Sequence, residues 1–191
     1  MTLLVTGCAG FIGSNFVYYY LEKHKDRKII GLDKLTYAGN LENLANLTQE
    51  QRERFKFIKG DICNNEFVEY IFQEYDIDGM INFAAESHVD RSIHDPQIFL
   101  RTNVIGTQTL LDVAKKHWYV DGKWKEGKKF LQVSTDEVYG SLGKEGYFTE
   151  STPLDPHSPY SASKASADLI VKAYHDTYNM PINITRCSNN Y

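Results

Sequence analysis

Leu3-Leu4-Val5-Thr6-Gly7-Cys8-Ala9-Gly10-Phe11-Ile12-Gly13 is the stretch that decides the fold of this chain. Its apolar start, Leu3–Val5, is typical of a buried parallel strand. After the glycines, apolar residues recur at helical spacing from Phe16 to Leu21. A strand, a glycine-rich turn and a helix in this order predict a dinucleotide-binding fingerprint.

The three glycines of this turn have different expected roles. Gly7 allows the tight turn, Gly10 lets a pyrophosphate approach the backbone, and Gly13 lets the helix and strand pack closely. The free N–H groups and the positive end of the helix dipole would face the phosphates. The spacing is G-x-x-G-x-x-G rather than G-x-G-x-x-G, so the motif needs support from elsewhere in the chain.

An acidic residue at the end of the next strand supplies that support. The apolar run Lys28–Leu32 ends at Asp33, which stands 20 positions after Gly13. A carboxylate at this distance hydrogen-bonds the ribose 2′-hydroxyl of NAD, and it would repel the extra phosphate of NADP. Lys34 follows at once, so the sequence favours NAD without excluding NADP. The alternative is that Asp33 is an ordinary loop residue.

The composition excludes several classes of protein. A chain of 191 residues that is 42% hydrophobic suits one soluble domain with a substantial core. A formal charge of −4 gives no reason to expect a nucleic-acid partner. No apolar run approaches the ~20 residues of a membrane span, and no signal segment opens the chain. Cys8, Cys63 and Cys187 are widely spread, so we expect reduced thiols, a cytoplasmic protein and no metal site.

Strands and helices alternate along the rest of the chain. Beyond the first two strands, we predict strands at Phe55–Gly60, Gly79–Ala85, Phe130–Val133 and from Asn183 onward. Predicted helices are Leu41–Leu47, Phe67–Tyr75, Gln97–His117 with Gly106 as its only interruption, and Tyr160–Tyr178, and Trp118–Lys128 is predicted to be a solvated loop. This alternation predicts an α/β fold with an open parallel sheet, helices on both faces, and all carboxyl ends of the strands on one rim.

Polar and small residues gather where these strands end. Asp61 suits the rim of an adenine pocket or a cap on the following helix. Ala84–Ala85 leaves room for a ligand above the sheet. A lone histidine such as His88 is more often structural, but beside Ser87 at a strand end it indicates contact with a substrate. Asn103 is an unusual choice within a helix, and we expect it to hydrogen-bond the sheet or a neighbouring loop.

Tyr160 and Lys164 are four residues apart at a helix start, so both side chains project from one face. A free tyrosine titrates near pH ~10, and we expect the adjacent ammonium to lower the pKa of Tyr160. The same lysine can hold the nicotinamide ribose. Thr135, at the end of the fifth strand, can hydrogen-bond the hydroxyl that is oxidised. The alternative is a surface Tyr-Lys pair.

Asp136 and Glu137 follow Thr135 directly. Two consecutive carboxylates in a turn are ordinarily solvated, but beside a hydride-transfer site they suit a general acid and a general base with separated pKa values. A simple alcohol oxidation does not need them. Elimination of water does, because one group must remove a carbon-bound proton while another protonates the departing hydroxyl.

Together these motifs resemble the extended short-chain dehydrogenase/reductase family, and within it the dehydratases that act on dTDP-glucose. The motifs that carry the resemblance are Thr6–Gly13, Asp33–Asn40, Ala84–Ser92, Ser134–Gly140, Tyr160–Lys164 and Cys187–Tyr191. Cys8 stands where relatives usually have glycine, and we expect little effect from it. The resemblance implies a Rossmann-type doubly wound sheet and an NAD-dependent hydro-lyase.

The resemblance also implies the role of each residue. Tyr160 would take the proton of the sugar 4-hydroxyl with help from Thr135 and Lys164, and Glu137 would remove the C5 proton while Asp136 protonates the leaving 6-hydroxyl. Hydride would pass from C4 to NAD and return to C6. The implied cofactor residues are Gly7, Gly10, Phe11, Ile12, Gly13, Asp33, Lys34, Thr36, Asp61, Ile62, Ala84, Ala85, Thr102, Tyr160, Lys164 and Asn190. The implied substrate contacts are Ser87, Thr135 and Asn189, and a homodimer would pair through the helices around Gln97–His117 and Ser161–Tyr178.

Members of this family carry a carboxyl-terminal domain that grips the nucleotide of the substrate. We therefore expect residues 1–191 to be the NAD-binding domain with the catalytic residues, and the second domain to be absent from this chain, which leaves its own activity open. One alternative is an NAD-dependent sugar-nucleotide epimerase or decarboxylase, which needs no acid/base pair such as Asp136–Glu137. Another is an NAD-binding module without turnover, against which the intact Tyr160, Lys164 and Thr135 argue.

Overall fold

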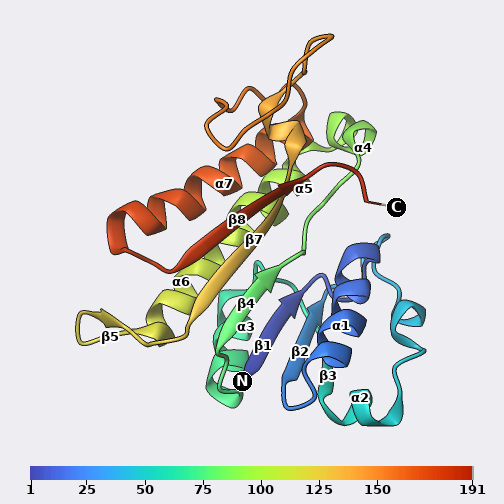
Figure 1. Cartoon of the computed structure of the whole chain (residues 1–191), viewed down its shortest axis with the longest axis vertical. Helices are drawn as coiled ribbons and strands as arrows, with labels where there is room; N and C mark the ends of the chain where they lie inside the picture. The colour runs from blue at the N-terminus through green and yellow to red at the C-terminus, as the bar shows by residue number, and fades with distance from the viewer. Residues whose placement is uncertain (191) are drawn as a thin grey trace.

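The computed structural model describes residues 1–190, and Tyr191, the last residue of one family motif, lies outside the described residues. A six-stranded parallel sheet in the order β3-β2-β1-β4-β7-β8 forms the centre of the molecule (Figure 1). Its strands are β1 (Thr2–Thr6), β2 (Lys28–Asp33), β3 (Phe55–Lys59), β4 (Gly79–Asn82), β7 (Lys129–Thr135) and β8 (Ile182–Cys187). The predicted Rossmann-type sheet is confirmed.

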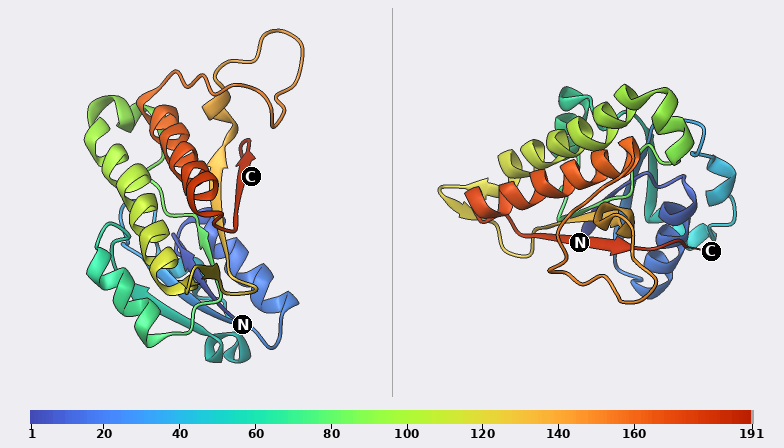
Figure 2. Two further views of the ribbon diagram at one scale, coloured as in Figure 1. Left: turned by 90° about the vertical axis from the view of Figure 1, so that its left-hand side faces the viewer. Right: turned by 90° about the horizontal axis from the view of Figure 1, so that it is seen from above.

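Helices cover both faces of the sheet, as the view from above shows (Figure 2). One face carries α3 (Asn65–Glu74), α6 (Thr107–Trp118) and α7 (Pro159–Tyr178), and the opposite face carries α1 (Phe11–Lys23). The shorter elements are η1 (Leu41–Leu44), α2 (Gln49–Glu53), α4 (Val89–His94), α5 (Pro96–Phe99), η2 (Leu100–Gly106), β5 (Tyr119–Val120), β6 (Lys123–Trp124) and η3 (Asp136–Tyr139). No helix within residues 1–190 is long and apolar enough to cross a membrane.

A large hydrophobic core lies on each face of the sheet. Leu3 and Val5 of β1 pack with Val17 and Leu21 of α1, whereas Leu4 packs in the core beneath α3, α6 and α7. All five side chains are buried. The alternation follows from the period of two along a strand, which sends successive side chains to opposite faces. A strand buried on both faces therefore reads as a continuous apolar run.

The predicted helix Gln97–His117 is continuous but not uniform. It consists of α5, the π-helical segment η2 and α6, so the predicted interruption at Gly106 is wrong. A Cβ added at Gly106 would lie 2.5 Å from Ile62 Cδ1, so the glycine is needed for close packing and not to break the helix. Leu41–Leu47 is also shorter than predicted, since only the 3-10 turn η1 forms there.

Two further predictions differ from the structure, one where the pairing of β1 with β4 ends and one where Trp118 is buried. The strand predicted at Gly79–Ala85 stops at Asn82, because its partner β1 ends opposite it at Thr6. The loop predicted at Trp118–Lys128 contains the hairpin β5–β6. Trp118 is buried, and its Nε1 donates to Ile77 O at 2.9 Å, so this segment is anchored to the core and is not simply solvated.

The side chain of Asn82 joins three elements inside the core. It accepts a hydrogen bond from Thr6 Oγ1 at 2.6 Å, and its Nδ2 donates to Gln132 Oε1 at 2.9 Å and to Thr107 Oγ1 at 3.2 Å. The three strands β1, β4 and β7 and the start of α6 thus share one buried amide. Buried polar groups that lose such a partner are costly.

We predict that Asn82→Ala lowers the free energy of unfolding by roughly 2–4 kcal/mol, because it leaves Thr6 and Gln132 short of a partner in the core. Urea denaturation of wild type and variant measures the difference. The control is Asn46→Ala, whose exposed side chain should change stability by less than about 0.5 kcal/mol. Equal stability of the two variants would contradict the prediction.

Candidate active site

The glycine turn places the start of α1 directly over the end of β1. Gly7 has a φ of +65°, and a Cβ there would lie 2.7 Å from Ala84 N. A Cβ on Gly13 would lie 2.1 Å from Gly7 O, so no side chain fits between helix and turn. Gly10 differs, because a Cβ there would meet its nearest protein atom at 3.4 Å. Gly10 is therefore open toward the space in front of the helix, where the amides of the first turn have no acceptor within the helix.

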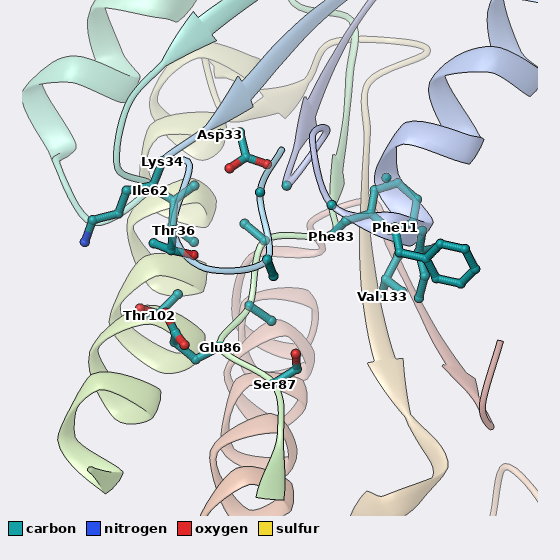
Figure 3. Close-up of a pocket in the computed structure, with 18 of the residues that line it drawn as sticks. Phe11, Asp33, Lys34, Thr36, Ile62, Phe83, Glu86, Ser87, Thr102 and Val133 are labelled. Atoms are coloured by element: carbon teal, nitrogen blue, oxygen red, sulfur yellow. The ribbon is translucent and has the colours of Figure 1, made fainter. Parts of the chain in front are cut away.

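A cavity of about 430 Å³ opens at this point, at the carboxyl ends of β1 and β4, where the strand order reverses. Figure 3 shows its wall, with Asp33, Thr36 and Ser87 around the hollow and the Lys34 amine directed away from it. The predicted cofactor residues that line the cavity are Gly7, Gly10, Phe11, Ile12, Gly13, Asp33, Lys34, Thr36, Asp61, Ile62, Ala84, Ala85, Thr102, Tyr160 and Lys164. Asn190 does not line it. The open Gly10 backbone, the free amides and the carboxylate at the end of β2 fit a dinucleotide.

Asp33 is buried and already holds the backbone on both sides of the site. Its Oδ2 accepts from Ala9 N at 2.9 Å and its Oδ1 accepts from Leu35 N at 2.8 Å. The interpretation of Asp33 as an ordinary loop residue is therefore wrong. Each carboxylate oxygen can accept a further hydrogen bond, so Asp33 can still receive a ribose hydroxyl.

Asp61 forms part of the rim and is not a helix cap. The cap of α3 is Asn64, whose side chain accepts from Phe67 N, so the capping alternative for Asp61 is wrong. Asp61 instead pairs with Lys34 at 2.8 Å and accepts from Cys63 N at 2.9 Å. Burial works to raise the pKa of Asp61, but these two partners together hold it below its ordinary value.

Two loops close over the outer side of the cavity. Tyr37 donates its hydroxyl to Ser87 O at 3.0 Å, and its Oη lies 3.3 Å from Ser87 Oγ. The Arg91 guanidinium lies 3.5 Å from the centre of the Tyr37 ring. His88, with a φ of +77°, also packs against this ring. Ser87 lies on the cavity wall, as predicted for a substrate contact, and Tyr37 holds it there.

Asn103 fixes the backbone of the segment that follows β4 by hydrogen bonds. Its Oδ1 accepts from Glu86 N at 2.8 Å, and its Nδ2 donates to Glu86 O at 2.9 Å and to Ser163 Oγ at 2.8 Å. The expected hydrogen bond to a neighbouring loop is therefore confirmed. The Glu86 carboxyl itself lines the cavity, and burial raises its pKa while Arg91 opposes the shift.

Tyr160 and Lys164 project from the first turns of α7 into the inner end of the cavity. Lys164 is buried, and its Nζ donates to Val133 O at 2.8 Å. Burial lowers the pKa of Lys164 to about 8. Burial, followed by the negative charge of Glu137, raises the pKa of Tyr160 to about 12. The expected lowering of the Tyr160 pKa is therefore wrong for this structure, because desolvation of the phenol and the charge of Glu137 outweigh the lowering effect of its hydrogen bond with Thr135.

Thr135, Asp136 and Glu137 form the turn next to this helix. Thr135 caps η3, since its Oγ1 accepts from Glu137 N at 3.2 Å, and the same hydroxyl lies 3.4 Å from Asp136 Oδ1. Burial, followed by the charge of Asp136, raises the pKa of Glu137. η3 packs against the start of α7 through Val138, Tyr139 and Ala165, and the charge of Glu137 contributes to the raised pKa of Tyr160.

Five of the predicted site residues are not part of the cavity wall. Thr135, Asp136 and Glu137 stand beyond its inner end, and Asn189 and Asn190 are exposed after β8. Sequence reasoning missed other wall residues, which are Leu32, Ala38, Gly39, Gly60, Phe83, Glu86, Val133, Ser134 and Cys187. Most of them are neighbours in the sequence of a predicted residue at the end of a strand, and this proximity could have identified them. Within residues 1–190 no three His, Cys, Asp or Glu side chains gather as metal ligands would.

Comparisons with known proteins bear on this geometry. The sequence pattern described as GDP-mannose 4,6 dehydratase matches residues 4–191. A dTDP-glucose 4,6-dehydratase of Xanthomonas campestris pv. campestris is 51% identical over 191 residues, which cover 100% of this chain and 53% of the relative. A crystal structure of dTDP-glucose 4,6-dehydratase from Bacillus anthracis in complex with NAD has a TM-score of 0.86 and 52% identity, and covers 100% of this chain and 56% of its own.

A more distant similarity reaches a different enzyme. UDP-glucose 4-epimerase of Thermotoga maritima, in a structure with UDP-glucose, has a TM-score of 0.82 and 29% identity over 97% of this chain and 55% of its own. The chain spans about half the length of the curated relatives it matches. The resemblance inferred from the motifs is thus confirmed at the level of the family. Since the pattern covers almost every residue, the chain belongs to the GDP-mannose 4,6 dehydratase family.

Proposed function

We propose that this chain is the NAD-binding, catalytic part of a hydro-lyase that converts dTDP-glucose to its 4-keto-6-deoxy sugar. The observation that carries the proposal is the packing of η3, which holds Asp136 and Glu137, against the start of α7, which holds Tyr160 and Lys164, at the inner end of a cavity built on a dinucleotide fingerprint. The names of the relatives from Xanthomonas and Bacillus support the choice of substrate.

The cofactor is held by the two ends of the cavity wall. The Gly7–Gly13 turn receives the pyrophosphate, Asp33 the adenosine ribose, and Lys164 the nicotinamide ribose. When bound, NAD⁺ accepts a hydride from C4 of the sugar and later returns it to C6. NAD in the Bacillus anthracis structure supports this assignment.

Tyr160 takes the proton of the 4-hydroxyl in the first half of the reaction. Its high pKa means that the phenol holds its own proton at rest, so a positive charge must favour the phenolate when the oxidation begins. Lys164, on the same face of α7, supplies that charge. Thr135 hydrogen-bonds the reacting hydroxyl and Ser87 contacts the sugar.

Glu137 and Asp136 carry out the elimination. The 4-keto group acidifies the C5 hydrogen, Glu137 removes that proton, and Asp136 protonates the 6-hydroxyl, which leaves as water. The raised pKa of Glu137 brings it closer to neutral pH, where a general base works best. An epimerase or decarboxylase is the second candidate, supported by the similarity to the Thermotoga maritima epimerase. Such enzymes need no acid/base pair beside the threonine, so the dehydratase is preferred.

Three further assignments belong to this proposal. Residues 1–191 form the cofactor domain, in which Asn189 contacts the substrate. Contacts to the nucleotide come from a second domain like the one the family carries. The protein is cytoplasmic, with Cys8, Cys63 and Cys187 as free thiols. A homodimer forms through η2 and α7, where Leu100, Ile105 and Leu169 are each at least half exposed, at 51%, 50% and 56%.

We predict that Asp33→Asn weakens NAD⁺ binding about 10-fold or more and lowers the preference for NAD⁺ over NADP⁺, because the charge on the ribose site is lost. Calorimetric titration with each cofactor measures both constants. The ratio of the two constants is an internal control, since any disturbance of the Ala9 and Leu35 contacts affects both cofactors. Asp26→Asn, at an exposed carboxylate, should change neither constant. An unchanged ratio of the two binding constants in Asp33→Asn would contradict the proposed contact between Asp33 and the ribose.

We predict that Glu137→Gln stops the natural full-length enzyme after the oxidation, so that NADH absorbance persists and little 4-keto-6-deoxy sugar forms. Stopped-flow absorbance with dTDP-glucose follows the first step, and alkali treatment of the product reports the second. General bases contribute about 10²–10⁴-fold, and the loss of turnover should fall in this range. Glu145→Gln, on the exposed loop, is the matched control. Wild-type turnover in Glu137→Gln would contradict the role of Glu137 as the base that removes the C5 proton.

We predict that Leu169→Glu converts the dimer to a monomer, because a charge on this apolar face must be desolvated at the interface. Light scattering coupled to gel filtration measures the mass. Leu142→Glu changes an equally apolar, 47% exposed residue in the loop after η3, and it should leave the mass unchanged. A wild-type protein that is already monomeric would contradict the proposed interface.

A further inference from the structure

A buried ion pair lies one layer behind the inner wall of the cavity. Asp168 of α7 is only 1% exposed, and its Oδ2 accepts from Arg186 Nε of β8 at 2.8 Å. Its Oδ1 is buried and has no hydrogen-bond partner of good geometry within residues 1–190. Burying a carboxylate is costly even when it is paired with an arginine, so Asp168 has to be explained by its effect on its neighbours.

The fold places this carboxylate directly beside the catalytic lysine. Asp168 follows Lys164 by four residues on α7, and both are buried. In the sheet, Arg186 of β8 pairs in register with Ser134 of β7. Lys164 and Ser134 both line the cavity, so Asp168 and Arg186 form the layer behind them.

The same ion pair reaches the turn that carries the acid and the base. Arg186 Nη1 donates to Tyr139 Oη at 2.8 Å, and Tyr139 ends η3, the element that begins with Asp136. The Tyr139 ring is stacked on Phe148, with 5.1 Å between ring centres. One arginine therefore connects α7, β8 and η3, the three elements that meet at the inner end of the cavity.

The negative charge of Asp168 counteracts the effect of burial on the pKa of Lys164. Burial lowers the pKa of Lys164, and Asp168 is the group that opposes this most strongly. Burial also raises the pKa of Asp168, and Arg186, with help from Ser134, opposes that shift. The titratable or charged groups around Lys164 are Tyr160 and Asp168 on its own helix, Arg186 and Cys187 on β8, Glu137 and Tyr139 on η3, and Glu86 after β4.

We propose that Asp168 is a positioning residue that keeps the Lys164 ammonium charged at the inner end of the cavity, and that Arg186 keeps Asp168 ionised for this purpose. Asp168 touches neither substrate nor cofactor, and acts through Lys164. The inference rests on the proposed function, in which the charge of Lys164 favours the Tyr160 phenolate and holds the nicotinamide ribose. Without Asp168, Lys164 and Arg186 would lose the buried carboxylate that they share.

The test is the pH dependence of NAD⁺ binding to the natural full-length protein, measured by calorimetry. Affinity in the wild type should fall as the pH rises through about 8, where Lys164 loses its proton. In Asp168→Asn the same fall should occur at least about one pH unit lower, because the opposite charge is gone. Asp168→Glu restores a carboxylate and should return the midpoint toward that of the wild type.

The matched control is Asp176→Asn, which removes a negative charge from an exposed Lys172 pair on the same helix. Its midpoint should equal that of the wild type. A wild-type midpoint in Asp168→Asn, or an affinity in the wild type that does not change between about pH 6 and 10, would overturn the proposal. A merely structural ion pair would weaken binding at every pH without moving the midpoint.

Arg186 gives a second test if Asp168→Asn does not fold, which circular dichroism would show. Arg186→Met should let Asp168 take a proton, so the midpoint falls as well, whereas Arg186→Lys keeps the charge and the wild-type midpoint. Equal midpoints in Arg186→Met and Arg186→Lys would overturn the proposal. Failure of the proposed function looks different, because the wild type would bind NAD⁺ with this pH dependence but would not convert dTDP-glucose.

Discussion

The contact between Gly13 and Gly7 O is the constraint on which the rest of the structure depends. Any side chain at Gly13 would overlap this carbonyl, so α1 can start directly above the end of β1 only because the residue is glycine. This approach aims the first amides of α1 at the cavity and sets the depth at which a ligand can lie. The neighbouring ends of β2, β4 and β7 then complete the wall, since parallel strands bring their carboxyl ends to one rim.

Burial, more than the charge of a neighbouring residue, controls the chemistry at this rim. Tyr160 and Lys164 are adjacent on α7, yet their pKa values move in opposite directions, because desolvation disfavours the charged form of each. A spacing of four residues predicts that two side chains share a face, but not how much water they keep. Asp168, paired with Arg186 behind the cavity wall, offsets part of the desolvation that lowers the pKa of Lys164.

Sequence patterns predicted most of the fold and much of the site. Continuous apolar runs marked the strands, and helical spacing marked α1, α3 and α7 within a few residues. The patterns failed where tertiary packing decides, as at Trp118, whose indole is buried within a segment that is otherwise polar. The capping alternative for Asp61 also failed, because the capping side chain of α3 stands three residues later in the chain, at Asn64, whereas Asp61 lines the cavity as predicted.

The sequence by itself determined the parallel sheet, the glycine turn, Asp33 at the end of β2 and the Tyr160–Lys164 pair, because each depends on local spacing. Only the tertiary structure decided that Glu86 lines the cavity, that Tyr37 holds Ser87, and that Arg186 joins Asp168 to Tyr139. These groups are far apart in the chain, and no periodicity connects them. Their meeting follows from strand register and helix packing, which depend on how the whole core is filled.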